Sequence, residues 1–114
     1  MNSSLIYLAG PYSHIDPLVR AERAIAITRA AVKLISEGKH VFSPITESHQ
    51  YSMYGVSGGW EFWKEHDLLM LSKCDELYIL TLPGWRESVG VTAEMAEALR
   101  TGKTVTLLDE HFMD

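Results

Sequence analysis

The chain has 114 residues, of which 46% are hydrophobic and 22% charged, and its formal net charge is −5. This length supports one core, so we expect residues 1–114 to form a single domain. The acidic balance argues against a polymeric nucleic-acid partner, which needs a basic face. A lone cysteine, Cys74, excludes an internal disulfide framework and fits a reducing compartment. The N-terminal apolar run is too short for a signal peptide or membrane span, which predicts a cytoplasmic protein without a membrane partner.

The first half of the chain predicts a strand, a helix and a second strand. Leu5–Ala9 is a short apolar run, typical of a strand that is buried on both faces. Asp16 is the expected N-cap of a helix with Pro17 at its first position, and Gly38 ends this helix. Apolar residues form a helical stripe within it, at positions 18, 21, 25, 32 and 35. A short strand follows at 40–43, and residues 44–59 read as a long irregular segment.

The second half continues the alternation. We predict a helix over 60–73, a strand over 76–82, a helix over 88–101 capped by Gly102, and a last strand over 104–108. Strands that alternate with helices are typical of a parallel sheet flanked by helices. The sequence therefore predicts a small doubly wound, Rossmann- or flavodoxin-like α/β domain with four parallel strands in the order 2-1-3-4.

That fold predicts where a ligand binds. Doubly wound sheets bind ligands outside the carboxyl ends of their strands, where the strand order reverses. Gly10 follows the first predicted strand and Ser43 the second, so both are candidate ligand-binding residues.

Asp67 is the first candidate for chemistry. It shares a helical stripe with Trp60, Trp63, Met70 and Leu71, and a carboxylate among apolar side chains is costly unless it is hydrogen-bonded or paired. Two interpretations stay open: a structural aspartate bonded to nearby backbone or a tyrosine, or an active-site carboxylate with a tuned pKa.

The segment PGWRESVGVTAE, residues 83–94, carries the second carboxylate. If Ser88 caps the helix, Glu94 lies about 60° from Val91 around the helix axis and borders the buried face. It is then either a functional carboxylate or a surface residue favoured by the helix dipole. Ser88 and Gly90 fit an anion site at the helix start, although a serine cap commonly closes a helix without any ligand.

Other features leave alternatives open or exclude function classes. Segment 44–59 is either a lid or an oligomer interface, and Tyr7 is either a site residue or part of the core. The chain contains no P-loop, dinucleotide fingerprint, H-E-x-x-H, C-x-x-C or G-x-S-x-G motif, and its five histidines lack metal-ligand spacing. We therefore expect neither a cofactor nor a metal.

Three segments carry a resemblance to a known family. YLAGPYS, HDLLMLSKCDELYIL and SVGVTAEMAEALRTGKTV together resemble the nucleoside 2-deoxyribosyltransferase superfamily, and the likeness follows nearly the whole chain in order. In function, the closest likeness is to the 2'-deoxynucleoside 5'-monophosphate N-glycosidases. In overall sequence, it is to a branch of short bacterial and phage proteins.

The resemblance implies roles for five residues. Glu94 matches the glutamate nucleophile that attacks the anomeric carbon, and Asp67 matches the aspartate that orients the sugar and takes part in proton transfer. Tyr7 matches a tyrosine that lines the pocket. Ser88 and Gly90 match the phosphate-binding turn of the monophosphate hydrolases.

The sequence also departs from that pattern. The first loop lacks the basic residue of the monophosphate hydrolases and offers only His14, with Arg20 further on. Trp85 and Arg86 are additions before Ser88, and Arg86 is a candidate for the missing phosphate contact. We expect specificity to lie in these additions and in Gly84.

The expected function is that of an N-glycosidase or deoxyribosyltransferase acting on a nucleoside or nucleoside 5'-monophosphate. The alternative is a non-catalytic module that binds a nucleotide-like ligand on the same fold. The resemblance further implies a homo-oligomer, either a dimer or a tetramer.

Overall fold

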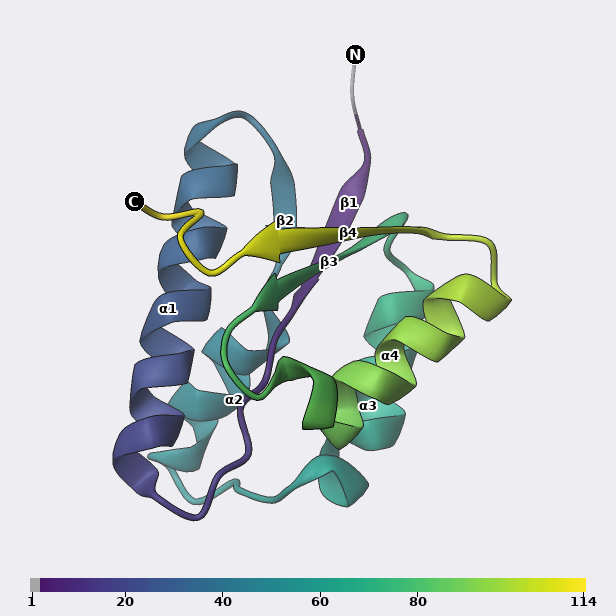
Figure 1. Cartoon of the computed structure of the whole chain (residues 1–114). Coiled ribbons are helices and arrows are strands. Elements are labelled where there is room, and N and C mark those ends of the chain that lie inside the picture. Colours follow the sequence, from purple (N-terminus) through teal and green to yellow (C-terminus); the bar gives the residue numbers. More distant parts are fainter. Residues whose placement is uncertain (1–2) are drawn as a thin grey trace.

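The computed structural model describes residues 3–114 and contains a four-stranded sheet between layers of helices (Figure 1). Its elements in chain order are β1 (Leu5–Ala9), α1 (Pro17–Ser36), β2 (His40–Phe42), α2 (Pro44–Ser52), α3 (Trp60–Ser72), β3 (Glu76–Thr81), the 3-10 turn η1 (Trp85–Glu87), α4 (Val89–Arg100) and β4 (Thr104–Asp109).

All strand pairs are parallel, and the strand order is β2-β1-β3-β4. The predicted fold class and strand order are thus confirmed. Tyr7 of β1 pairs in register with Phe42 of β2 on one side and with Leu77 of β3 on the other. The order of strands reverses beside β1, so the loops after β1 and β3 meet at the predicted ligand edge.

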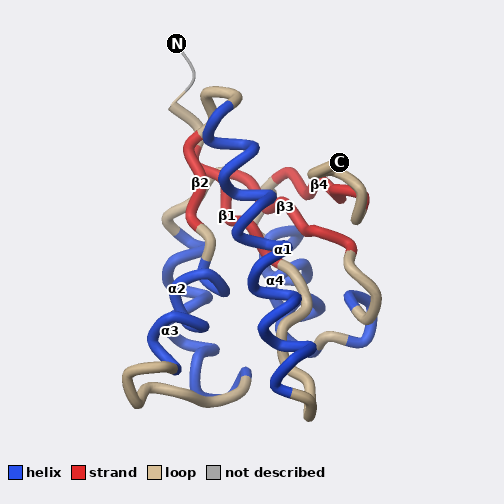
Figure 2. Tube along the Cα trace, turned by 90° about the vertical axis from the view of Figure 1, so that its left-hand side faces the viewer, coloured by secondary structure: helices blue, strands red, loops and turns tan. Residues whose placement is uncertain are grey.

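The two faces of the sheet are covered by different helices, as Figures 1 and 2 show from two directions. Neighbouring residues of a strand point to opposite faces. Tyr7 therefore packs with Leu71 of α3 and Val91 of α4, whereas Leu8 packs with Ile27 of α1. This alternation aims Tyr7 at the helices that carry Asp67 and Glu94.

Helix α1 begins as predicted but does not bury its large apolar stripe. Asp16 caps it by accepting a hydrogen bond from the Leu18 backbone N–H, at 2.9 Å. The residues of α1 that face the sheet are instead Ala24, Ile27, Ala30, Ala31 and Leu34. The alanines allow the helix to approach the strands closely. Leu18, Ile25, Val32 and Ile35 lie on the other side of α1 and face solvent.

The contact between α1 and β1 also explains Gly10. A Cβ atom on Gly10 would lie 2.7 Å from Cδ1 of Ile27, closer than packed carbon atoms come. A small residue directly after β1 therefore lets Ile27 of α1 pack here without a shift of its side chain.

The expectation of an irregular segment over 44–59 is wrong, because its first part folds as α2. Pro44 at the first helical position fits a helix start, but the segment has almost no apolar stripe and so lacks a helical pattern. Helix α2 forms against α1, where Thr28 and Thr46 hydroxyls are 2.7 Å apart. The other strand and helix ends lie within two residues of the predicted ones.

Candidate functional site

A cleft of about 1160 Å³ opens at the carboxyl ends of β1 and β3. Its lining includes Gly10 after β1, Asp67 of α3, and Ser88, Gly90 and Glu94 at the start of α4. Five of the residues proposed from the sequence therefore come together at the edge where strand order reverses.

Glu94 lines the cleft although only 6% of the residue is exposed. It lies in the second turn of α4, and the neighbouring Val91 and Ala98 pack into the core. Tyr7 is fully buried on β1, and its hydroxyl donates a hydrogen bond to Oε2 of Glu94. Within residues 3–114 no other hydrogen bond reaches this carboxyl group, so Oε1 stays available to the cleft.

The environment separates the pKa values of the two carboxyl groups. Burial raises the pKa of Glu94 to about 8, against the opposing effect of the Tyr7 hydrogen bond. Burial also raises the pKa of Asp67, to about 6, while nearby His66 lowers it. At neutral pH Glu94 is thus mostly protonated and Asp67 mostly ionised. Two coupled carboxyl groups with different pKa values can hold and move a proton.

Tyr7 itself stays neutral. Burial first, and then the charges of Glu94 and Asp67, raise the pKa of its phenol well above the usual range. The hydroxyl is therefore a permanent hydrogen-bond donor that fixes the position of the Glu94 carboxyl group.

Ser88 and Gly90 lie at the start of α4, on the cleft. The Ser88 side chain caps the helix by accepting from the Val91 N–H at 3.2 Å. A Cβ atom on Gly90 would lie 3.2 Å from Cε3 of Trp60, so this glycine also gives room to the Trp60 ring. The turn thus combines a helix N-terminus, which favours anions, with an aromatic wall.

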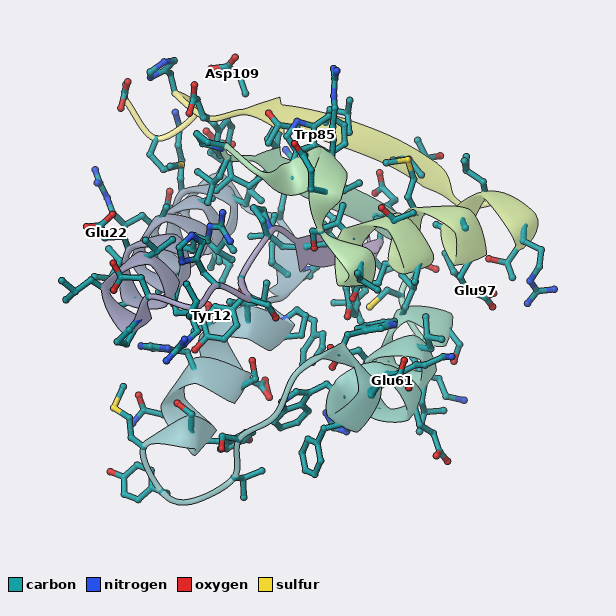
Figure 3. The ribbon with its side chains drawn as sticks, turned by 60° about the horizontal axis from the view of Figure 1, so that its bottom comes forward. Tyr12, Glu22, Glu61, Trp85, Glu97 and Asp109 are labelled. Carbon is teal, nitrogen blue, oxygen red and sulfur yellow. The ribbon has the colours of Figure 1, made fainter. Side chains whose placement is uncertain are left out.

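Three proposed site residues are not among those that line this cleft: Ser43, Arg86 and Tyr7, which lies behind Glu94. The Ser43 hydroxyl lies 2.8 Å from the Thr46 hydroxyl at the start of α2. Arg86 is exposed and extends over the Trp85 ring, 5.2 Å from its centroid, beside a separate hollow. Figure 3 shows Trp85 near β4, away from Tyr12 at the cleft. Arg86 thus lines a different hollow from the carboxyl groups, and its role as a phosphate contact stays a prediction.

The cations that do line the cleft are Arg20 and Arg23 of α1. Arg23 donates to the backbone carbonyls of Ser13, at 2.9 Å, and Pro83, at 3.1 Å, and so ties the loops after β1 and β3 together. Gly84 has a φ of +94°, and a Cβ atom there would lie 2.6 Å from an Arg23 guanidinium nitrogen. The sequence contained a signal for this pair, because arginines three residues apart in the first turns of a helix share a face.

An aromatic wall is the other feature that the sequence did not assign to the site. Tyr12, Trp60 and Trp63 line the cleft. The Tyr12 hydroxyl lies 2.7 Å from Nδ1 of His49 in α2, which links α2 to the loop after β1. Trp60, Trp63 and Asp67 share one face of α3 by their spacing, so the stripe that contains Asp67 was the available signal.

Within residues 3–114, no group of three or more histidine, cysteine, aspartate or glutamate side chains is arranged to hold a metal ion. None of the helices in that part of the chain has the length and hydropathy needed to cross a membrane.

The sequence matches the model of a known family. No protein of curated function matches the sequence significantly. Residues 4–110 match the family described as Domain of unknown function (DUF1937), which covers β1 through β4 and every cleft residue named above. The chain therefore belongs to the DUF1937 family.

Proposed function

We propose that this protein cleaves or transfers the base of a nucleoside or nucleoside 5'-monophosphate, with Glu94 as the nucleophile. The observation that carries the proposal is a buried carboxyl group, Glu94, that is held by the Tyr7 hydroxyl and coupled to Asp67 at one cleft. The resemblance to the nucleoside 2-deoxyribosyltransferase superfamily gives the same three positions matching roles.

The proposed chemistry needs both carboxyl groups. The reactive form is the minor one in which Glu94 is ionised and Asp67 holds the proton. In that form a Glu94 carboxylate oxygen bonds to the anomeric carbon as the bond from that carbon to the base nitrogen breaks. The bonding electrons go to the base, which takes a proton from Asp67 in its protonated form. Water, or a second base in a transferase, then attacks the anomeric carbon, gives up a proton to the ionised Asp67 and releases Glu94 as a carboxylate. The pKa of about 6 for Asp67 leaves part of this group protonated near neutral pH.

An anionic substrate is favoured by the residues around the cleft. Ser88 stands where the transferases carry an aspartate, and an acid there would repel a phosphate. Arg20 and Arg23 add positive charge at the cleft. Both guanidinium groups also bind backbone carbonyls, so they are held in place before a ligand arrives. These features support a nucleoside 5'-monophosphate over a neutral nucleoside.

One observation favours a second candidate, a non-catalytic module that binds a nucleotide-like ligand. Burial keeps the Glu94 carboxyl mostly protonated at neutral pH, because its pKa is about 8. A protonated carboxyl is a hydrogen-bond donor and a poor nucleophile, so it suits binding.

The decisive experiment incubates the purified protein with a panel of nucleosides and 5'-monophosphates and measures free base by chromatography. We expect base release that falls by at least about a thousandfold in Glu94→Gln, since a nucleophile acts as part of a unit. Glu97→Gln is the matched control, because Glu97 lies on the same helix but pairs with Arg100 at the surface. It should leave base release unchanged.

The outcomes separate the two candidates. If no substrate releases base, while a monophosphate binds equally well to the wild type and to Glu94→Gln, the enzyme proposal is wrong and the binding module is favoured. Equal loss of base release in Glu94→Gln and Glu97→Gln would also contradict the proposed nucleophile.

A further inference from the structure

The outer face of α1 and the loop before it carry five large apolar side chains that the core does not use. They are 53–92% exposed: Ile15, Leu18, Ile25, Val32 and Ile35. Their positions are symmetric in the sequence about Ile25, with Leu18 and Val32 seven residues to either side and Ile15 and Ile35 ten. An exposed apolar patch of this kind usually marks an interaction surface.

The three central side chains form one continuous stripe. Residues seven apart differ by only about 20° around a helix, so Leu18, Ile25 and Val32 lie on one line along α1. Figures 1 and 2 show α1 on the outside of the molecule, and Figure 2 views its uncovered side. The opposite side of the helix packs on the sheet through Ile27 and Leu34.

Two opposite charges flank this stripe on the same side. Glu22 and Arg29 lie about 60° and 40° from Ile25 around the helix axis, before and after it along the chain. Both are exposed, and neither forms an ion pair within residues 3–114. Seven residues of helix separate them by about 10 Å, too far to pair with each other. Figure 3 shows Glu22 at the outer edge of the molecule.

We propose that α1 pairs antiparallel with α1 of a second copy of this chain, across a two-fold axis at Ile25. In this arrangement Ile25 meets Ile25 of the other copy, and Leu18 meets Val32. A two-fold axis keeps each flank of the stripe on the same side of the pair, so Glu22 of each copy lies beside Arg29 of the other. A two-fold interface requires a self-complementary surface, and the apolar positions and the charges of α1 both satisfy that requirement.

The size of the contact sets the expected affinity. A 20-residue helix is about 30 Å long and about 10 Å wide, so one helix from each copy gives an interface at the small end of specific association. We therefore expect a dimer with a dissociation constant on the order of micromolar.

Sedimentation equilibrium of the full chain between about 1 and 100 µM tests the interface. We expect a mass that rises toward twice the 12.8 kDa of one chain. Ile25→Lys should remain monomeric throughout that range, because it brings two positive charges together at the axis. Lysine is a good helix former, and a circular dichroism spectrum will confirm that the variant folds. Leu99→Lys is the control, since Leu99 is an exposed apolar residue of α4 and the change should leave dimerisation intact.

Charge reversal tests the antiparallel register. Glu22→Lys places a lysine beside Arg29 of the other copy at two symmetric positions, and Arg29→Glu does the same with two acids. Each single change should weaken the dimer by about tenfold, and the double variant Glu22→Lys/Arg29→Glu should restore the wild-type constant.

Three results would overturn the proposal. A wild-type protein that stays monomeric at 100 µM excludes a second copy as the occupant, and leaves a different partner for this face. A dimer that survives in Ile25→Lys forms through another surface. Failure of the double variant to restore binding excludes the antiparallel register. All three tests measure the molar mass of the protein in solution, so their outcome does not depend on whether the protein cleaves nucleotides.

Discussion

Helices α1 and α4 cover opposite faces of the same sheet, and they differ in the kind of side chain that they bury. Helix α1 buries three alanines beside Ile27 and Leu34 and leaves its other large apolar residues in solvent. Helix α4 buries Val91 and Ala98 and, between them, a carboxyl group. The surface that a helix packs against therefore decides which of its side chains can be buried. Alanines of α1 fit where that helix lies on the sheet, and Glu94 of α4 can be buried because the Tyr7 hydroxyl donates a hydrogen bond to it.

Two isoleucines of α1 give the largest effect that tests this contrast. Ile27 is fully buried and Ile25 is 59% exposed, although only one residue separates them. Ile27→Ala removes packed methylene groups and should lower the free energy of unfolding by about 2–5 kcal/mol, whereas Ile25→Ala should change it by less than about 0.5 kcal/mol. Urea unfolding at low micromolar concentration measures both. Similar losses in the two variants would mean that the burial of α1 is assigned to the wrong side.

The carboxyl group of α4 predicts a pH dependence. The folded pKa of Glu94, about 8, lies above the ordinary value of 4.5, so the folded state binds this proton more tightly than the unfolded state. The stabilisation is complete below pH 4.5 and is lost progressively as the pH rises from 4.5 through about 8. Glu94→Gln is neutral at every pH and should exceed the wild type in unfolding free energy by about 3–5 kcal/mol at pH 9.

The comparison of interest is between wild type and Glu94→Gln at each pH, because all other titrating groups are shared. At pH 5 both proteins should unfold with nearly the same free energy. A difference that is constant from pH 5 to 9 would show that Glu94 is not held neutral by burial.

The smallest effect concerns the contact that joins the two halves of the cleft. Gly84→Ala places a Cβ where the Arg23 guanidinium lies and forces a non-glycine residue to a φ of +94°. We expect a loss of about 1–2 kcal/mol in unfolding free energy. Gly38→Ala is the control, because Gly38 has a φ of +91° with open space around it. An equal loss in both variants would leave only backbone strain and exclude a contribution from Arg23.

Much of the fold followed from local pattern. Four short apolar runs, separated by helices with clear start and end signals at Asp16, Ser88 and Gly102, were enough to predict a parallel sheet and its strand order. Helix α2 was missed because a helix stabilised by contact with a neighbouring helix needs no apolar stripe of its own. The sequence also did not show which side of α1 faces the sheet, because alanines contribute little to a hydrophobic pattern.

The site was predicted in part. Glu94, Asp67 and Ser88 all line the cleft. They could be predicted because each has a recognisable position on a helix at the ligand edge of the sheet. Ser43 and Arg86 do not line the cleft, because chain position alone does not say which way a loop residue turns. Arg20 and Arg23 line the cleft from α1, a helix in which we predicted no site residue from the sequence.

For this protein, the sequence alone determined the order of elements, the parallel sheet and the two carboxyl-bearing helices, because these depend on spacings of a few residues. Only the tertiary structure decided that Tyr7 meets Glu94 across 87 positions of sequence, that Arg23 joins the loops beside Gly84, and that the large residues of α1 face outward. These are contacts between distant segments, and they depend on how closely each helix approaches the sheet.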